Sequence, residues 1–131
     1  RLNTLILGRK AYGRGQVFCY NQLGVYRLLC SHPDQDELIA LRDEILAPLV
    51  MYDQKQNTNL LETLDAYLSH NEDINDTAQA LYVHPNTIRY RLERAAKLTG
   101  LNLNTSEHRF QIYLALKIAS LYPFAHTVCT K

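Results

Sequence analysis

The stretch that decides the fold is residues 74–100, INDTAQALYVHPNTIRYRLERAAKLTG. Its first part carries apolar residues at helical spacing: Ile74, Ala78, Leu81 and Tyr82. This spacing predicts a short helix with one apolar stripe, in which the small Ala78 lets a second helix cross closely. Asn75 is expected to cap the helix, because its side-chain oxygen can accept a hydrogen bond from a free backbone N–H.

A tight turn at Val83-His84-Pro85 separates this helix from a second one. Pro85 disfavours helical geometry at the residue before it, so the first helix should end at His84. Asn86 is expected to cap the second helix, which should run to about Leu98, with Gly100 as a left-handed stop. The residues expected on the buried face of the second helix are Ile88, Leu92, Ala95 and Thr99, with Ala96 beside them.

The opposite face of the second helix is basic. The residues expected there are Tyr90, Glu93, Arg94 and Lys97. Residues 84–97 carry four basic side chains and one acidic side chain, a net charge of +3, whereas residues 60–83 carry five acidic side chains and no Lys or Arg, a net charge of −5. Such a localised charge is typical of a nucleic-acid-binding surface. Together with the tight turn, it predicts a DNA-binding helix-turn-helix.

The chemistry of this helix suits DNA, because a helix fits the major groove and arginine matches the acceptors of guanine. Asn86 can read adenine, and the methyl group of Thr87 can touch thymine. Arg91 lies nearer the core and is expected to reach sideways to a phosphate, while His84 either touches a phosphate or simply fills the turn. The alternative is that the arginines only form a solvated helix face. The tight turn, the short preceding helix and the small Ala78 favour DNA.

Residues 60–122 resemble the C-terminal helix-turn-helix domain of the PucR/CdaR-type bacterial transcription regulators. The segments that carry the resemblance are LLETLDAYLSHNEDINDTAQALYVHPNTIRYRLERAAKLTGLNL and RFQIYLALKIASL. The resemblance implies DNA contacts from Asn86, Thr87, Arg89, Tyr90, Arg91 and Arg94. The family often has a basic residue where this chain has Pro85. Residues 1–56 resemble more weakly, through VFCYNQLGVYRLL and LRDEILAPLVMYDQ, the end of the degenerate GGDEF-like domain that precedes the helix-turn-helix, which implies a non-catalytic linker or sensory region.

These observations predict a transcriptional regulator that binds an operator in double-stranded DNA, as a homodimer. The predicted DNA contacts are Thr77, His84, Asn86, Thr87, Arg89, Tyr90, Arg91, Arg94 and Lys97. The alternative function is a helical protein-interaction or oligomerisation module that does not bind DNA. The effector metabolite is expected to bind outside this chain, which lacks an initiator Met and is expected to be a fragment of a longer regulator.

The composition is that of an ordinary globular protein, with 131 residues, 47% apolar and 21% charged residues, and a net charge of +1. No apolar run is long enough for a membrane span, and there is no signal-peptide pattern. The odd number of cysteines fits a reducing cytosol, so a cytoplasmic protein is expected. Cys19, Cys30 and Cys129 are too few and too scattered for a disulfide framework; the first two are expected to pack as small hydrophobic side chains. Neither the cysteines nor the histidines have metal-ligand spacing. No nucleophile–base pair or phosphate loop is evident, so neither an enzyme nor a cofactor is expected.

The whole chain is expected to be mainly α, a helical bundle that contains the helix-turn-helix, with a small α+β remnant at the N-terminus. Residues 1–56 should form the partial linker or sensory region, and residues 57–131 the DNA-binding domain, with polar residues 52–58 at the boundary. Val17–Tyr20 is a candidate strand. A short helix is expected at Gly24–Cys30, with Leu23, Leu28 and Leu29 inward. A second is expected at Asp36–Met51, which Pro48 should kink or end near Ala47. Two more are expected at Leu60–Ser69, capped by Asn59 and with Leu61, Leu64 and Leu68 inward, and at about 106–122. The core stripe expected in the last helix is Phe110, Tyr113, Leu114, Lys117 and Ile118.

Overall fold

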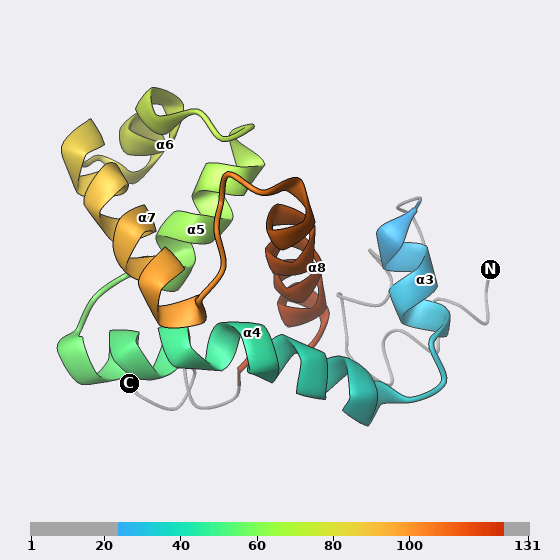
Figure 1. Cartoon of the computed structure of the whole chain (residues 1–131). Helices are drawn as coiled ribbons and strands as arrows, with labels where there is room; N and C mark the ends of the chain where they lie inside the picture. The colour runs from blue at the N-terminus through green and yellow to red at the C-terminus, as the bar shows by residue number, and fades with distance from the viewer. Residues whose placement is uncertain (1–23, 125–131) are drawn as a thin grey trace. The chain divides into compact units, whose positions relative to one another are not determined.

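The computed structural model describes residues 24–124, and this part of the chain is helical without a strand (Figure 1). Its elements are α3 (Val25–Ser31), α4 (Gln35–Gln56), α5 (Leu60–Ser69), α6 (Ile74–Leu81), α7 (Pro85–Thr99) and α8 (Ser106–Leu121). The expected mainly α fold is confirmed, while the candidate strand Val17–Tyr20 lies outside the described residues. None of the described helices combines the length and the apolar character that a membrane crossing requires.

The chain divides into two compact units, and α4 and α8 contribute residues to both. The central unit is Asp43–Tyr113, and the terminal unit combines Arg1–Arg42 with Leu114–Lys131. The domain boundary that the sequence predicts between residues 56 and 57 follows the end of α4 and stays a prediction.

The terminal unit has its own apolar cluster: Leu29, Leu38, Ile118, Leu121 and Tyr122. Arg42 is buried in this unit, where its guanidinium donates hydrogen bonds to the carbonyl oxygens of Tyr122 and Pro123 and lies 4.0 Å from the ring centre of Phe124. Cys30 packs against the cluster, as expected, but its sulfur is disulfide-bonded, which the sequence analysis did not predict. The expectation that Leu28 points inward is wrong, since 73% of its surface is exposed.

In the central unit α5, α6 and α7 pack against one another (Figure 1). The side chains buried on these helices are Leu60, Thr63, Leu64, Thr77, Ala78, Ile88, Leu92 and Ala95. Ala78 is only 3% exposed, which fits the expected close crossing of two helices. The bounds of α5 are those expected, but its inward face is centred on Leu60, Thr63 and Leu64. This three-helix packing holds α7 in place.

Helix α4 is longer than the sequence predicts, because it continues through Pro48 to Gln56. A proline inside a helix removes one hydrogen bond and crowds the preceding turn. The apolar side chains on either side of Pro48, Leu46 and Leu49, are fully buried, and their burial offsets that loss. The expectation that the helix ends near Ala47 is therefore wrong. The other possibility, a kink at Pro48, and the polar domain boundary at residues 52–58 stay predictions.

The continuation of α4 places Asp53 at the start of α5. The carboxylate of Asp53 accepts hydrogen bonds from the backbone N–H groups of Leu60, at 2.8 Å, and Leu61, at 3.0 Å, and from the hydroxyl of Thr58, at 2.6 Å. Asn59 stands at the N-cap position but makes no side-chain cap hydrogen bond. The cap of α5 thus comes from the preceding helix, and the expectation that Asn59 provides it is wrong.

The last helix begins at Ser106, as expected, but of its expected core stripe only Ile118 is fully buried. Its buried side chains are Ile112, Ala115, Leu116, Ile118 and Leu121. Phe110 and Tyr113, expected in the core, are 58% and 41% exposed. Apolar residues cover most of the circumference of this helix, so their spacing does not select one face.

Candidate nucleic-acid interface

Two side chains other than the expected ones cap the helices of the helix-turn-helix. The Asp73 carboxylate accepts a hydrogen bond from the N–H of Asp76 at 2.8 Å and caps α6, so Asn75 is not the cap. The His84 ring nitrogen Nδ1 accepts from the N–H of Asn86 at 2.9 Å and caps α7. Pro85 is therefore the first residue of α7, a position where its missing N–H is no loss. The expectation that Asn86 caps α7 is wrong, and its side chain is left for other contacts.

The turn between the helices begins earlier than expected. Helix α6 ends at Leu81, and Tyr82 takes a left-handed conformation with φ 59° and ψ 42°. Tyr82 is 93% exposed, so its expected place in the apolar stripe of α6 is wrong. At the other end of α7, Gly100 has φ 75° and stops the helix as predicted.

The faces of α7 are those that the sequence predicts. Ile88, Leu92 and Ala95 are buried. The exposed side chains of α7 include Asn86, Arg89, Tyr90, Glu93 and Lys97, while Thr87, Arg91 and Arg94 are half-buried. The predicted contact residues at the start of α7 and along its outer face are thus brought to one surface, next to the turn.

Two side-chain pairs shape this surface. The guanidinium of Arg89 donates a hydrogen bond to the amide oxygen of Asn86 at 2.6 Å, one helical turn away. The guanidinium of Arg94 donates to the hydroxyl of Tyr90 at 2.9 Å, and this hydrogen bond raises the pKa of Arg94. Both pairs hold an arginine against the helix and limit where its charge can be placed.

A residue of α4 that the sequence did not single out also contacts this surface. The guanidinium carbon of Arg94 lies 5.8 Å from the ring centre of Tyr52 and 5.5 Å from that of Tyr90, within the range of cation–π attraction. Tyr52 belongs to residues 52–58, the polar segment that the sequence predicts as the boundary between the two domains. No local pattern could reveal it, since the contact depends on the continuation of α4.

Arg91 forms a hydrogen bond with another side chain of the domain. Its guanidinium donates a hydrogen bond to the hydroxyl of Thr63 in α5 at 3.1 Å. The side chain is half-buried, in accord with the expected position near the core. Arg91 therefore connects α7 to α5.

Thr77 does not belong to this surface. Its side chain is fully buried, and its hydroxyl donates to the carbonyl oxygen of Asp73 at 2.7 Å. The hydroxyl thus closes the first turn of α6 inside the core. The prediction that the Thr77 side chain contacts DNA is wrong for this conformation.

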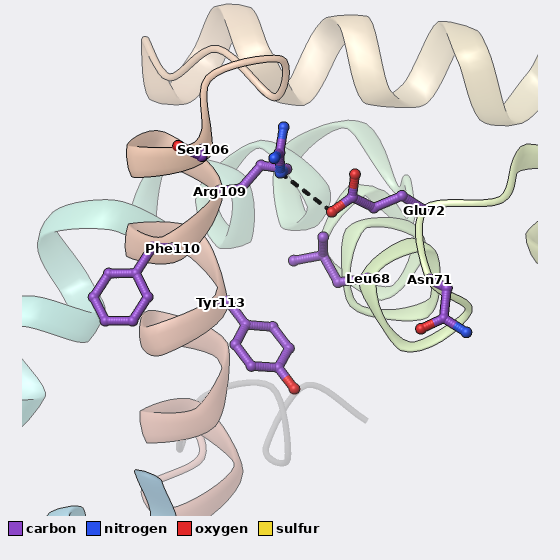
Figure 2. A pocket seen from close by; sticks show the side chains of 7 residues that line it. All are labelled: Leu68, Asn71, Glu72, Ser106, Arg109, Phe110 and Tyr113. Carbon is purple, nitrogen blue, oxygen red and sulfur yellow. Dashed lines mark ion pairs between the residues drawn. The ribbon is translucent and has the colours of Figure 1, made fainter.

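An open groove of about 530 Å³ lies elsewhere in the central unit, between the end of α5 and the start of α8 (Figure 2). Its lining residues are Leu68, Asn71, Glu72, Ser106, Arg109, Phe110 and Tyr113. Arg109 reaches across from α8 to Glu72, with 3.2 Å between the guanidinium nitrogen and the carboxylate oxygen. Nearby, burial raises the pKa of Tyr67, and Glu72 raises it further. No residue of α7 lines the groove, so it is separate from the surface described above.

The sequence of the central unit matches a known family. A family model described as the PucR C-terminal helix-turn-helix domain matches residues 60–118, from the start of α5 into α8. Residues 60–118 are thus similar to a PucR C-terminal helix-turn-helix domain. The resemblance that the sequence showed for residues 60–122 is thus confirmed over nearly its whole length. The matched region contains α6 and α7, the two helices on either side of the tight turn.

Bacterial regulators are similar to a larger part of the chain. The chain is 34% identical over 99 residues to the proline-responsive transcriptional activator PutR of Bacillus subtilis strain 168. The aligned residues make up 76% of the chain and 24% of PutR. Over 116 residues the chain is 32% identical to the carbohydrate diacid regulator of Escherichia coli strain K12, covering 88% of the chain and 29% of that relative. It is also 41% identical, over 68 residues, to the purine catabolism regulatory protein of Bacillus subtilis strain 168, covering 52% of the chain and 13% of that relative. The chain spans less than a third of each of these curated relatives.

Proposed function

We propose that this chain is the DNA-binding part of a transcriptional regulator, and that it inserts α7 into the major groove of an operator. The observation that carries the proposal is the exposed first half of α7, where Asn86, Arg89 and Tyr90 share one surface next to the tight turn. A helix end of this kind fits the major groove with its first residues at the base edges. The PucR-type domain and the regulator names of the relatives support the same function rather than an enzyme.

The side chains have different roles in this proposal. Asn86, Thr87 and Arg89 face base edges, and the hydrogen bond between Asn86 and Arg89 orients both side chains as a unit. Tyr90 and Arg94, held together and against Tyr52, face the phosphate backbone. The other proposed contacts with the phosphate backbone are His84, Arg91 and Lys97. Because one guanidinium nitrogen of Arg91 donates to Thr63, only the remaining N–H groups of Arg91 would bind a phosphate.

The organisation of the whole protein is also a proposal. Residues 57–131 form its DNA-binding domain, and residues 1–56 belong to a preceding GGDEF-like linker or sensory region. The protein binds as a homodimer to two half-sites about one helical turn apart, because a single short helix offers few base contacts. The effector metabolite binds to a part of the protein outside residues 1–131. The whole protein acts in the cytoplasm.

The decisive experiment selects duplexes from a random library with the chain of residues 1–131 and then measures their affinity by fluorescence anisotropy. A sequence-specific protein enriches one motif. Arg89→Ala should then weaken binding to the selected duplex by about 1–3 kcal/mol, roughly 5- to 150-fold, because a guanine contact is lost. Binding to an unrelated duplex should change little.

Lys97→Ala is the matched control on the same helix. Loss of a phosphate contact should weaken binding to both duplexes alike and reduce the slope of log affinity against log salt by about 0.9. The alternative function, a protein-interaction module, predicts neither an enriched motif nor a steep salt dependence. Absence of both for the unaltered chain would reject DNA binding.

A further inference from the structure

Tyr82 adopts a conformation that its own side chain disfavours. At the end of α6 it has φ 59° and ψ 42°, the left-handed region in which the Cβ of an L-residue crowds the following carbonyl oxygen. The backbone hydrogen bonds of this turn run from the N–H of Tyr82 to Gln79 and from the N–H of Val83 to Ala78, at 3.3 and 3.0 Å. A glycine would make the same bonds without the crowding. The turn itself therefore does not explain the tyrosine.

The packing of the domain does not explain it either. The side chain of Tyr82 is 93% exposed, more than any of the other large apolar or aromatic residues at the described surface. An exposed ring gains almost none of the free energy that burial of an aromatic side chain provides. The backbone conformation of Tyr82 thus disfavours the folded domain, and its side chain gives no compensating burial; backbone strain of this kind is often found at functional sites.

The position of Tyr82 indicates what it binds. It stands two residues before His84, the cap of α7, and therefore at the end of α7 that carries Asn86 and Arg89. In the proposed docking this end approaches the DNA, and tyrosine hydroxyl groups are among the donors that bind phosphate oxygens. We propose, on the basis of the proposed function, that the Tyr82 hydroxyl binds a phosphate of the DNA backbone beside the half-site.

Two substitutions in the chain of residues 1–131 separate the ring, the hydroxyl and the backbone. Tyr82→Gly removes the side chain and relieves the left-handed crowding, so the melting temperature should rise while affinity for DNA falls roughly tenfold, as for loss of a hydrogen bond to a charged acceptor. Tyr82→Phe keeps the conformation and the ring, so affinity should fall similarly with an unchanged melting temperature. Selected and unrelated duplexes should be affected alike, because a phosphate contact carries no sequence information.

The salt dependence distinguishes this contact from that of a cation. A neutral hydroxyl displaces no counterion, so the salt slope of both variants should equal that of the unaltered chain, unlike Lys97→Ala. Unchanged affinity of Tyr82→Gly would overturn the inference while leaving the proposed function intact. If Tyr82→Gly binds DNA more weakly and light scattering also shows a lower molar mass than for the unaltered chain, Tyr82 contacts a second copy of the chain rather than a phosphate, and the inference is overturned. If the unaltered chain binds no DNA, the proposed function itself fails.

Discussion

Arg91 of α7 and Thr63 of α5 are joined by a hydrogen bond of 3.1 Å from the guanidinium to the threonine hydroxyl. Thr63 is fully buried, and its hydroxyl also donates to the carbonyl oxygen of Asn59 at 2.7 Å. A hydroxyl has one donor and two acceptor sites, so Thr63 uses its donor for Asn59, just before α5, and one acceptor site for Arg91 of α7. These two hydrogen bonds fix α7 against the start of α5.

Removal of this connection should be visible as a loss of stability. Arg91→Ala should lower the free energy of unfolding by about 1–3 kcal/mol, because a hydrogen bond to a charged group is lost and a buried acceptor is left unsatisfied. Urea denaturation followed by circular dichroism measures the change. Lys97→Ala, which removes an exposed cation from the same helix, should change it by less than about 0.5 kcal/mol. Equal effects of the two substitutions would show that the Thr63 contact contributes nothing to stability.

The cap that α4 provides for α5 yields a second prediction. Asp53→Ala removes the acceptor of two backbone N–H groups and of the Thr58 hydroxyl, and should lower the free energy of unfolding by about 1–2 kcal/mol, as for loss of a helix cap. Asn59→Ala is the matched control, since Asn59 makes no cap hydrogen bond. It should cost less than about 0.5 kcal/mol. If Asn59→Ala is the more harmful change, the cap belongs to Asn59 in solution.

Sequence alone predicted the features that depend on local spacing. The apolar period and the polar residues around it placed α5 at its observed bounds, and Gly100 marked the end of α7 because a left-handed stop favours glycine. Ile88, Leu92 and Ala95 were recognised as the buried face of α7 for the same reason. The family followed from the motif around the turn.

Features that depend on contacts between distant segments could not be predicted. Asp53 caps α5 only because α4 continues past Pro48, and the same continuation brings Tyr52 to Arg94. The choice of His84 over Asn86 as a cap depends on backbone angles, since either side chain can accept from an N–H. Tyr82 fits the apolar stripe of α6 by its spacing, but its left-handed backbone turns it out to the solvent.

The contact between Tyr52 and Arg94 should matter for DNA binding rather than for stability. Tyr52→Ala should weaken binding about 2- to 5-fold, as expected for loss of an exposed cation–π contact that positions the guanidinium. In an Arg94→Ala background the same change should have no further effect, because Tyr52 acts through Arg94. Fluorescence anisotropy of the four proteins of this cycle measures the coupling. Gln54→Ala, an exposed change on α4, is the control, and additive effects of the two substitutions would contradict the coupling.

The raised pKa of Tyr67 predicts a loss of stability at alkaline pH. Burial and then Glu72 favour the neutral phenol in the folded protein, so its pKa there lies above the ordinary value of 10.0. The folded state holds this proton more tightly than the unfolded state, so the contribution of Tyr67 is complete below pH 10.0 and is lost as the pH rises through the folded pKa. Measured from about pH 8 to about pH 12, the free energy of unfolding of Tyr67→Phe should therefore fall less steeply than that of the unaltered chain. Glu72→Gln should lessen the slope in part, because it removes the second cause of the shift, and parallel curves for all three proteins would show that Tyr67 titrates normally.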